Sequence, residues 1–163
     1  GEMFVSAMIA VAAVNDSIED IILGGLSQIP TSSRLYEAVM KIYDDYKNGV
    51  SIDGCFEYIH SSYDEHTDHG WCHTISNAMI VTAALLYGEG DFGKSICIAV
   101  SMAFDTDCNG ATVGSILGMR GSIDCIDDYW KKPVNGKIHT SIFGIGTLDI
   151  EKAVDKTLEH IQA

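Results

Sequence analysis

The amino-acid sequence predicts an all-α protein, and three features of its 163 residues support that fold class. Apolar side chains recur with the three- and four-residue spacing of a helix along most of the chain. The periodic segments have the length of helices, and only two prolines occur among them. We therefore expect one compact domain over residues 1–163, built from roughly seven or eight helices.

Four helices are expected before the polar loop DEHTDHG, over residues 2–14, 17–28, 32–47 and 51–63. The first contains an apolar run of twelve residues, MFVSAMIAVAAV, and has no capping residue before it. A membrane-spanning helix needs about 20 apolar residues, so we expect this run to be buried within the protein. Asn15 or Asp16 is expected to cap the second helix, and Ser51 the fourth.

The second half of the chain is predicted to contain the central helices. Residues 71–87 are apolar on nearly every face, which is typical of a helix surrounded by others, and residues 95–104 form a second buried helix. A further helix is expected over residues 108–121. Residues 126–134 then form a short helix or a loop, and residues 135–146 form a loop with extended pieces. The last helix, over residues 148–161, is amphipathic.

The charge balance excludes one class of partner. The chain carries 23 acidic and 10 basic residues, a formal net charge of −13, whereas nucleic-acid binding requires a basic surface. The five cysteines are odd in number and contain no C-x-x-C pair, so we expect reduced thiols in a cytoplasmic protein.

Two aspartates in the stretch FDTDCNG are candidate metal ligands. Residues two apart on a helix point about 200° away from each other, so Asp105 and Asp107 converge only if the helix begins after them. Asp107 would then be the N-cap, and the two carboxylates would suit Mg²⁺, Mn²⁺ or Ca²⁺. In the alternative, Asp107 only caps the helix and Asp105 faces solvent. The residues alone leave the two interpretations balanced.

Glycines follow the two aspartates at helical spacing. Gly110, Gly114 and Gly118 would form one stripe on the helix expected there. Each glycine costs about 1 kcal/mol of helix propensity, so the stripe predicts the close approach of another backbone.

The stretch AFDTDCNGATVGSILG resembles the carboxy-terminal D-T-D-[TS] motif and glycine-rich helix of the ADP-ribosylglycohydrolase family, which also includes a jellyfish lens crystallin. The segments GEMFVSAMIAVAAV, GLSQIPTSSRLYEAV, HGWCHTISNAMIVTAALLYGEGDFGKSICIAV and DYWKKPVNGKIHTSI extend the likeness, in order, to the later two-thirds of such proteins. The resemblance implies an all-α fold and a centre of two metal ions, usually Mg²⁺, with Mn²⁺ as a substitute. It also implies hydrolysis of the bond between the anomeric carbon of a terminal ribose and a modified side chain or small leaving group.

By position, the resemblance assigns two family ligands to Asp105 and Asp107, with Asp107 as the bridge between the metals. A third ligand, a threonine or serine hydroxyl, falls on Cys108, whose thiol is a poor ligand for the hard Mg²⁺ ion. Phe104 replaces a glycine that often precedes the first aspartate, and we expect its ring to narrow the entrance or stack on a ligand.

The family's amino-terminal [ST]-D-D motif has no counterpart in this sequence. We therefore expect the chain to be a fragment, incomplete at its N-terminus and inactive in isolation. Surface left bare by such truncation would favour a homodimer. The alternative function is a non-catalytic ADP-ribose-binding or structural member of the fold, as the crystallin is.

Two further groups of residues are weaker candidates. His73 and Asn77 are one helical turn apart and match a subset of the family, so they are candidates for substrate binding, although a hydrogen-bonded helix end explains them too. His66, His69 and Cys72, together with His73, offer a zinc site as a third hypothesis, but their spacing fits no established zinc pattern.

Overall fold

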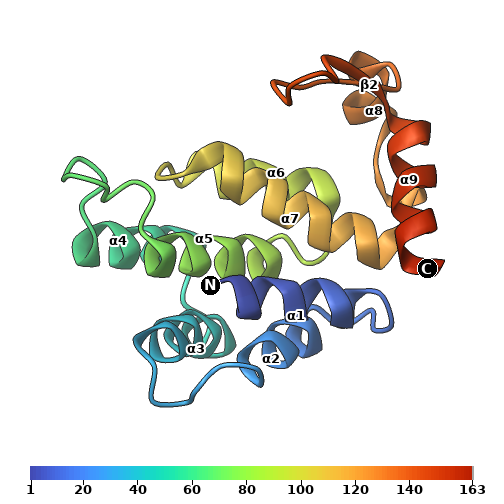
Figure 1. The fold of residues 1–163 in the computed structure, drawn as a ribbon. Helices are drawn as coiled ribbons and strands as arrows, with labels where there is room; N and C mark the ends of the chain where they lie inside the picture. Colours follow the sequence, from blue (N-terminus) through green and yellow to red (C-terminus); the bar gives the residue numbers. More distant parts are fainter. Residues whose placement is uncertain (163) are drawn as a thin grey trace. The chain divides into compact units, whose positions relative to one another are not determined.

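The fold is all-α, as the sequence predicts, in a computed structural model that describes residues 1–162 (Figure 1). The helices are α1 (Glu2–Ala12), α2 (Ile18–Leu26), α3 (Arg34–Lys47), α4 (Ile52–Ser62), α5 (Thr74–Tyr87), α6 (Phe92–Ser101), α7 (Thr106–Gly121), α8 (Asp128–Val134) and α9 (Ile150–Gln162). A short 3-10 helix, Ile123–Cys125, follows α7. The chain divides into two compact units, residues 1–125 and 126–163, and its description as one domain stays a prediction.

Side-chain caps fix where most helices of the first unit begin. The capping side chains each accept a hydrogen bond from the backbone N–H three residues on, and they are Ser17, Ser33, Ser51 and Asp91. The prediction for Ser51 is confirmed. The expected cap of α2 by Asn15 or Asp16 is wrong, because Ser17 occupies that position and Asn15 instead accepts a hydrogen bond from the Ser17 backbone N–H at 2.8 Å.

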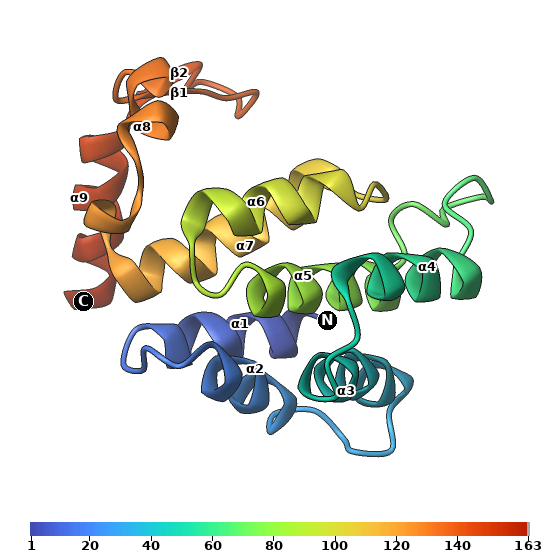
Figure 2. The ribbon, with the colours of Figure 1, turned by 180° about the vertical axis from the view of Figure 1, so that it is seen from behind.

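The first unit is arranged in layers around α5. In Figures 1 and 2, α6 and α7 lie on one side of α5 and α1, and α2 and α3 lie on the other. All residues from Ala78 to Leu86 are buried, so the expected helix with neighbours on every face is confirmed. Phe4, Met8 and Ala12 bury one side of α1, and among residues 1–162 no helix has the length and apolar character to cross a membrane.

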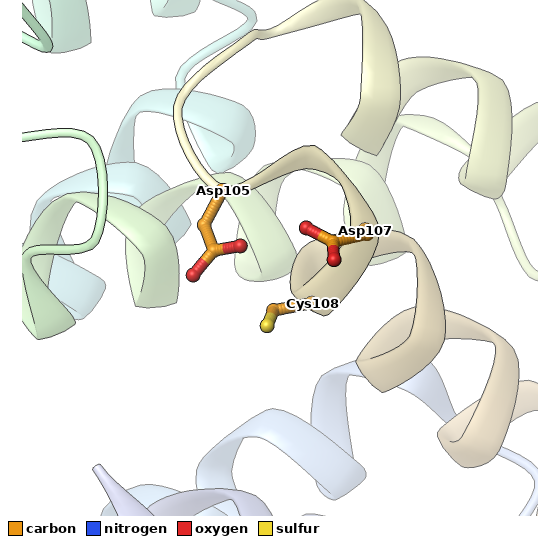
Figure 3. A group of neighbouring side chains, drawn as sticks. All are labelled: Asp105, Asp107 and Cys108. Atoms are coloured by element: carbon orange, nitrogen blue, oxygen red, sulfur yellow. The ribbon is translucent and has the colours of Figure 1, made fainter. Parts of the chain in front are cut away.

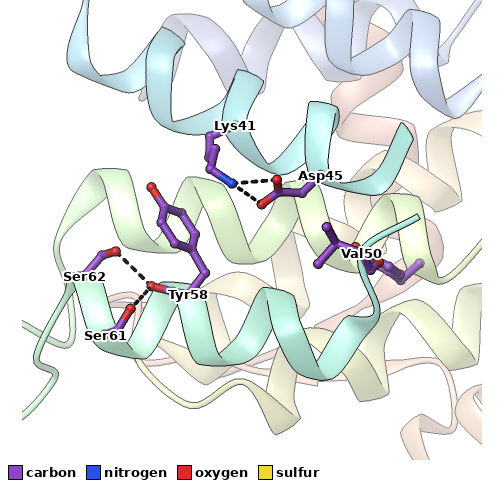
Figure 4. A network of polar contacts seen from close by, with 7 residues as sticks. Lys41, Asp45, Val50, Tyr58, Ser61 and Ser62 are labelled. Carbon is purple, nitrogen blue, oxygen red and sulfur yellow. Dashed lines mark hydrogen bonds and ion pairs between the residues drawn. The ribbon is translucent and has the colours of Figure 1, made fainter. Parts of the chain in front are cut away.

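Polar contacts join α3, α4 and α5 at one edge of this unit (Figure 4). The Lys41 ammonium pairs with the Asp45 carboxylate one turn along α3, and it lies 4.6 Å from the ring centroid of Tyr58 on α4. The Tyr87 hydroxyl, at the end of α5, donates a hydrogen bond of 2.7 Å to the carbonyl of Val50 before α4. These contacts hold α4 beside the central helix.

A tight helix–helix contact at a glycine lies between α1 and α2, and none lies at Gly110, Gly114 or Gly118 of α7. A Cβ added at Gly25 would lie 2.7 Å from Met8 Cγ and 2.8 Å from Phe4 Cδ2. On α7, a Cβ at Gly114 would meet only side chains of α6, at 3.6 Å or more, and a Cβ at Gly118 would meet nothing within 4 Å. The prediction that the α7 stripe packs against another backbone is therefore wrong.

The second unit consists of α8, a β-hairpin and α9. Strands β1 (Lys137–His139) and β2 (Thr147–Asp149) pair antiparallel, with Ile138 opposite Leu148. The sequence predicted only extended pieces there, because three-residue strands give too short an alternation to identify. The predicted final helix is confirmed as α9. Within residues 126–162 no residue is buried, and Val154 and Leu158 of α9 are exposed.

Replacing the α7 glycine that faces open space should stabilise the protein. We expect Gly118→Ala to raise the free energy of unfolding by about 0.5–1 kcal/mol, because alanine favours a helix and its Cβ meets no atom. Gly25→Ala is the matched control, and we expect it to lower that free energy by about 1–3 kcal/mol through overpacking against α1. Urea unfolding followed by circular dichroism measures both. A destabilised Gly118→Ala protein would restore the original interpretation of the stripe.

Two fully buried serines should respond differently to the same substitution. Ser95 and Ser76 are both 0% exposed, but Ser95 Oγ has no hydrogen-bond partner in the described structure, whereas Ser76 Oγ donates to the His73 carbonyl at 3.0 Å. We expect Ser95→Ala to leave stability unchanged or raise it by about 1 kcal/mol, and Ser76→Ala to lower it by about 1 kcal/mol. Thermal unfolding of the two variants compares them directly, and equal losses would contradict the expectation.

Candidate metal centre

The two candidate aspartates lie at the start of α7, where the chain turns sharply after α6 (Figure 3). Ala103 and Phe104 have φ values of 61° and 56°, in the left-handed region that non-glycine residues seldom adopt. This turn lets α7 begin at Thr106, with Asp105 at the N-cap position and Asp107 inside the first turn. The prediction that the helix begins after Asp107, capped by it, is wrong because the turn is completed two residues earlier.

The carboxylates nevertheless converge. One ligand atom each from Asp105, Asp107 and Cys108 lie within 4.8 Å of one another. Asp105 has a non-helical backbone, with φ −86° and ψ 73°, so the 200° separation of helical residues two apart does not apply to it. Side chains in the first turn of a helix lean back toward its N-terminus, which brings Asp107 and Cys108 toward Asp105. Figure 3 shows the three side chains turned toward one another.

Neither aspartate is used as a helix cap, which is the alternative that the sequence left open. Asp105 occupies the N-cap position of α7, and yet its side chain accepts no hydrogen bond from a backbone N–H of the first turn. Asp91 and Asp127, at the corresponding positions of α6 and α8, both do accept such bonds. Capping therefore does not explain Asp105, and its carboxylate is available to a ligand.

The spacing of the carboxylates suits a hard divalent cation. Mg²⁺ lies about 2.1 Å from each oxygen ligand, so two ligand atoms of one ion are at most about 4.2 Å apart, and for Ca²⁺ the limit is about 5 Å. The three ligand atoms lie within 4.8 Å of one another, which is inside the limit for Ca²⁺. A small side-chain rotation would bring them inside the limit for Mg²⁺. Asp107 is exposed and Asp105 half-buried, so the pair is open to ions from solvent. The assignment of both as metal ligands stays a prediction.

Cys108 fits such an ion less well. A hydrogen bond to the Asp105 carboxylate, then partial desolvation and the charges of Asp105 and Asp107, raise the pKa of the thiol above its usual value of 9.0. Metals bind the thiolate form, and this environment favours the neutral thiol. The chain thus offers two hard oxygen donors and one soft sulfur, and Cys108 as a ligand stays a prediction.

Asn77 of α5 holds the backbone at the start of α7. Its Oδ1 accepts hydrogen bonds from the Asp105 backbone N–H at 3.1 Å and from Asn109 Nδ2 at 2.7 Å. Its Nδ2 donates to the carbonyls of Trp71 at 2.9 Å and His73 at 3.0 Å. These four bonds use both lone pairs and both N–H groups of the amide. In this arrangement Asn77 positions other groups, and its role in substrate binding stays a prediction.

His73, the other predicted substrate-binding residue, is the N-cap of α5. Its Nδ1 accepts a hydrogen bond of 3.2 Å from the Ile75 backbone N–H, and its ring lies 5.6 Å from the Tyr63 ring, centroid to centroid. The side chain is exposed, so Nε2 can still reach a ligand. The zinc hypothesis gains no support, because within residues 1–162 only Asp105, Asp107 and Cys108 form a group of three metal-binding side chains.

Phe104 is in the core and not at an entrance. It is 7% exposed, and its ring centroid lies 5.1 Å from that of His60 at the end of α4. The expectation that this ring narrows the entrance or stacks on a ligand is wrong, because the left-handed turn directs it inward.

Sequence reasoning missed two residues beside the aspartates. Glu65, in the loop between α4 and α5, accepts a hydrogen bond of 2.8 Å from the Phe104 backbone N–H through Oε2. Asn109 is 2% exposed on α7 and bonds Asn77. An asparagine on the buried side of a helix was a readable signal, because buried amides need partners. Nothing in the polar stretch DEHTDHG distinguished Glu65 from its neighbours.

Comparison with known proteins gives one positive result. The sequence model of the family described as ADP-ribosylglycohydrolase matches residues 1–163, the whole chain. Neither the curated proteins nor the solved structures gave a match.

Removing the Asn77 side chain should cost more stability than its partial exposure suggests. We expect Asn77→Ala to lower the free energy of unfolding by about 2–3 kcal/mol, because Asn109 Nδ2 and the Asp105 N–H lose their acceptor. Asn48→Ala, at the exposed end of α3, is the matched control and should change stability by less than about 0.5 kcal/mol. Urea unfolding of both variants gives the comparison, and equal effects would show that the four bonds contribute nothing.

Proposed function

Because the chain belongs to the ADP-ribosylglycohydrolase family, we propose that it takes part in the metal-dependent removal of ADP-ribose from modified side chains or small molecules. The bond cleaved joins the anomeric carbon of the ribose to its substituent. The observation that carries the proposal is the convergence of Asp105 and Asp107 at a helix start that neither of them caps. Family membership alone supports a hydrolase of ADP-ribose linkages, and the metal dependence rests on these two carboxylates.

The roles of the two aspartates follow from their surroundings. Asp107, exposed in the first turn of α7, would contact both ions of a two-metal centre, and Asp105, whose backbone N–H is bonded to Asn77, would hold one of them. Divalent cations, Mg²⁺ or Mn²⁺, supply Lewis-acid stabilisation of charge and orient the ribose hydroxyls when bound. A carboxylate beside an attacking water matches the logic of glycoside hydrolysis, whose transition state resembles an oxocarbenium ion.

Two carboxylates are too few ligands for two ions, and residues 1–162 contain one such group only. We expect this group to be half of the centre, with the other ligands supplied by polypeptide outside these residues. The chain by itself should then bind metal weakly and turn over little or no substrate. No proton-transferring acid is assigned among the described residues.

A second function is favoured by Cys108. The thiol stands where the related motif has a hydroxyl ligand, and sulfur is a poor ligand for the hard Mg²⁺ ion. A member of the family that binds ADP-ribose or serves a structural purpose, without catalysis, would tolerate that change.

The proposal also bears on partners and location. The substrate is an ADP-ribosyl group, and the net charge of −13 argues against nucleic acid. All five cysteines are free thiols, which suits a reducing compartment such as the cytoplasm. Exposed apolar side chains occur in each unit, Met3 and Phe143 among them, and we expect a homodimer to cover part of that surface.

Metal binding by the 163-residue chain tests the assignment of Asp107 directly. We expect Mn²⁺, followed by the relaxation of water protons, to bind the wild type and to bind Asp107→Asn at least tenfold more weakly, or about 1.4 kcal/mol. Asp53→Asn removes the same charge from the first turn of α4 and should bind Mn²⁺ as the wild type does. Equal affinity in the wild type and in Asp107→Asn would contradict the metal role.

Turnover separates the two candidate functions. The chain joined to the segment that supplies the missing ligands should release ADP-ribose from an ADP-ribosylated protein in the presence of Mg²⁺ or Mn²⁺, and Asp107→Asn should abolish that release. Calorimetry with ADP-ribose and metal provides the second arm. Binding of ADP-ribose without turnover of any linkage would favour the non-catalytic function.

A further inference from the structure

Two consecutive backbone N–H groups just before α7 are each bound by a side chain from a different segment. The Phe104 N–H donates to Glu65 Oε2 at 2.8 Å, and the Asp105 N–H donates to Asn77 Oδ1 at 3.1 Å. Asn77 belongs to α5, and Glu65 to the loop that precedes it. Both bonds act on the peptide units that set the direction of the Asp105 side chain.

This turn needs external support. Ala103 and Phe104 both have left-handed backbones, and such residues cost of order 1 kcal/mol each unless surrounding contacts hold them. The Phe104 ring is held in the core against His60, and Asn77 holds the N–H of Asp105. Glu65 supplies the hydrogen bond at the second left-handed residue. A bond to an ionised carboxylate is about twice as strong as one between neutral groups.

The position of Glu65 has no other explanation in its surroundings. Its side chain is only 23% exposed, and its ion pair with His66 is long, at 3.9 Å, with His66 87% exposed. Such a pair contributes little stability. Glu65 is also outside the group formed by Asp105, Asp107 and Cys108, so it is not arranged as a ligand of the same ion.

The loop that carries Glu65 is folded by its own hydrogen bonds. Asp64 Oδ1 accepts the His66 N–H at 2.9 Å, Thr67 Oγ1 donates to the Asp64 carbonyl at 2.8 Å, and the Gly70 N–H donates to the Thr67 carbonyl at 2.9 Å. The loop therefore does not need the Glu65 contact to keep its shape, and removal of that carboxylate should act mainly on the turn before α7.

We propose that Glu65 is a positioning residue for the metal-binding carboxylate of Asp105, acting through the Phe104 N–H and not through direct contact with metal. This inference rests on the proposed function of the aspartates. Without Glu65, the Ala103–Phe104 peptide loses the hydrogen bond on its N–H, and of the two external contacts only the one from Asn77 to the Asp105 N–H remains. The Asp105 carboxylate then samples orientations that do not meet Asp107, and metal affinity falls.

The test compares three variants of the full 163-residue chain by Mn²⁺ affinity and by amide hydrogen exchange. We expect Glu65→Ala to weaken Mn²⁺ binding about 10- to 100-fold, the usual loss for a residue that orients a ligand. Glu65→Gln keeps an acceptor oxygen for the Phe104 N–H and should stay within about threefold of the wild type, because the turn before α7 is still held. Asp68→Ala removes a charge from the same loop, where the structure gives its side chain no partner, and should change nothing. Exchange at the Phe104 amide should accelerate in Glu65→Ala alone.

Each other outcome is decisive. Equal weakening in Glu65→Ala and Glu65→Gln would overturn the positioning role in favour of a charge effect or direct ligation. Unchanged Mn²⁺ affinity in Glu65→Ala would overturn it while leaving the proposed function intact. If the wild type binds no Mn²⁺, the proposed function is wrong, and the positioning role that rests on it is wrong too. An unchanged exchange rate of the Phe104 amide in Glu65→Ala would show that Glu65 does not hold that N–H. Circular dichroism of each variant shows whether the fold is retained.

Discussion

The rest of the first unit depends on one buried apolar helix that has to be joined to its neighbours by polar contacts at its end. α5 is buried from Ala78 to Leu86, so it offers no side chain there to direct a neighbour by hydrogen bonding except Thr82, which bonds its own helix. Asn77, one residue before that stretch, makes the connection. Its amide links the loop before α5, the first turn of α5 and the start of α7. Because all four of its bonds are made, the start of α7 has one defined position relative to α5.

Helix type and order were predictable for most of the chain, because burial imposes a periodic pattern on a packed helix. That pattern is missing from α8, which has no buried residue and which the sequence left as a short helix or a loop. The caps and first residues of the helices were harder to predict from the sequence. The cap of α2 fell on Ser17 and not on Asn15 or Asp16, and α7 began two residues early because Ala103 and Phe104 adopt left-handed backbones. Neither residue type favours that conformation, so tertiary contacts impose it. The prediction drawn from the glycine stripe on α7 was wrong for a related reason. The glycines do have helical spacing, but α6 faces them with side chains and not with its backbone.

The candidate site divides in the same way. Asp105 and Asp107 could be identified from the sequence because they are close together in it. The resemblance to a known motif then suggested their chemical role. Glu65 could not be identified from the sequence, because its partner is the backbone N–H of Phe104, 39 residues away. Every residue except proline has a backbone N–H, so the sequence does not show which one a side chain binds. Residues that act on side chains of known type can be guessed from motifs. Residues that act on the backbone become visible only when the turn they hold is seen.

Cys108 lies beside two carboxylates that repel each other, so its effect on that repulsion matters as well as its ability to bind a metal. The Asp105 and Asp107 carboxylates have oxygens within 4.8 Å of each other. At such a distance two negative charges repel by roughly 1 kcal/mol in water and by about 3–4 kcal/mol in a partly buried setting. Exposure of Asp107 and the positive end of the α7 dipole offset part of this. The Cys108 thiol also offsets part of it through its hydrogen bond to the Asp105 carboxylate. A hydroxyl at this position would make the same donation, so the thiol keeps the role that holds the two charges together without metal. What it loses is the hard oxygen donor. The thiol is therefore compatible with the convergence of the two carboxylates, and under the proposed function Asp105 and Asp107 would be the only hard ligands in this group.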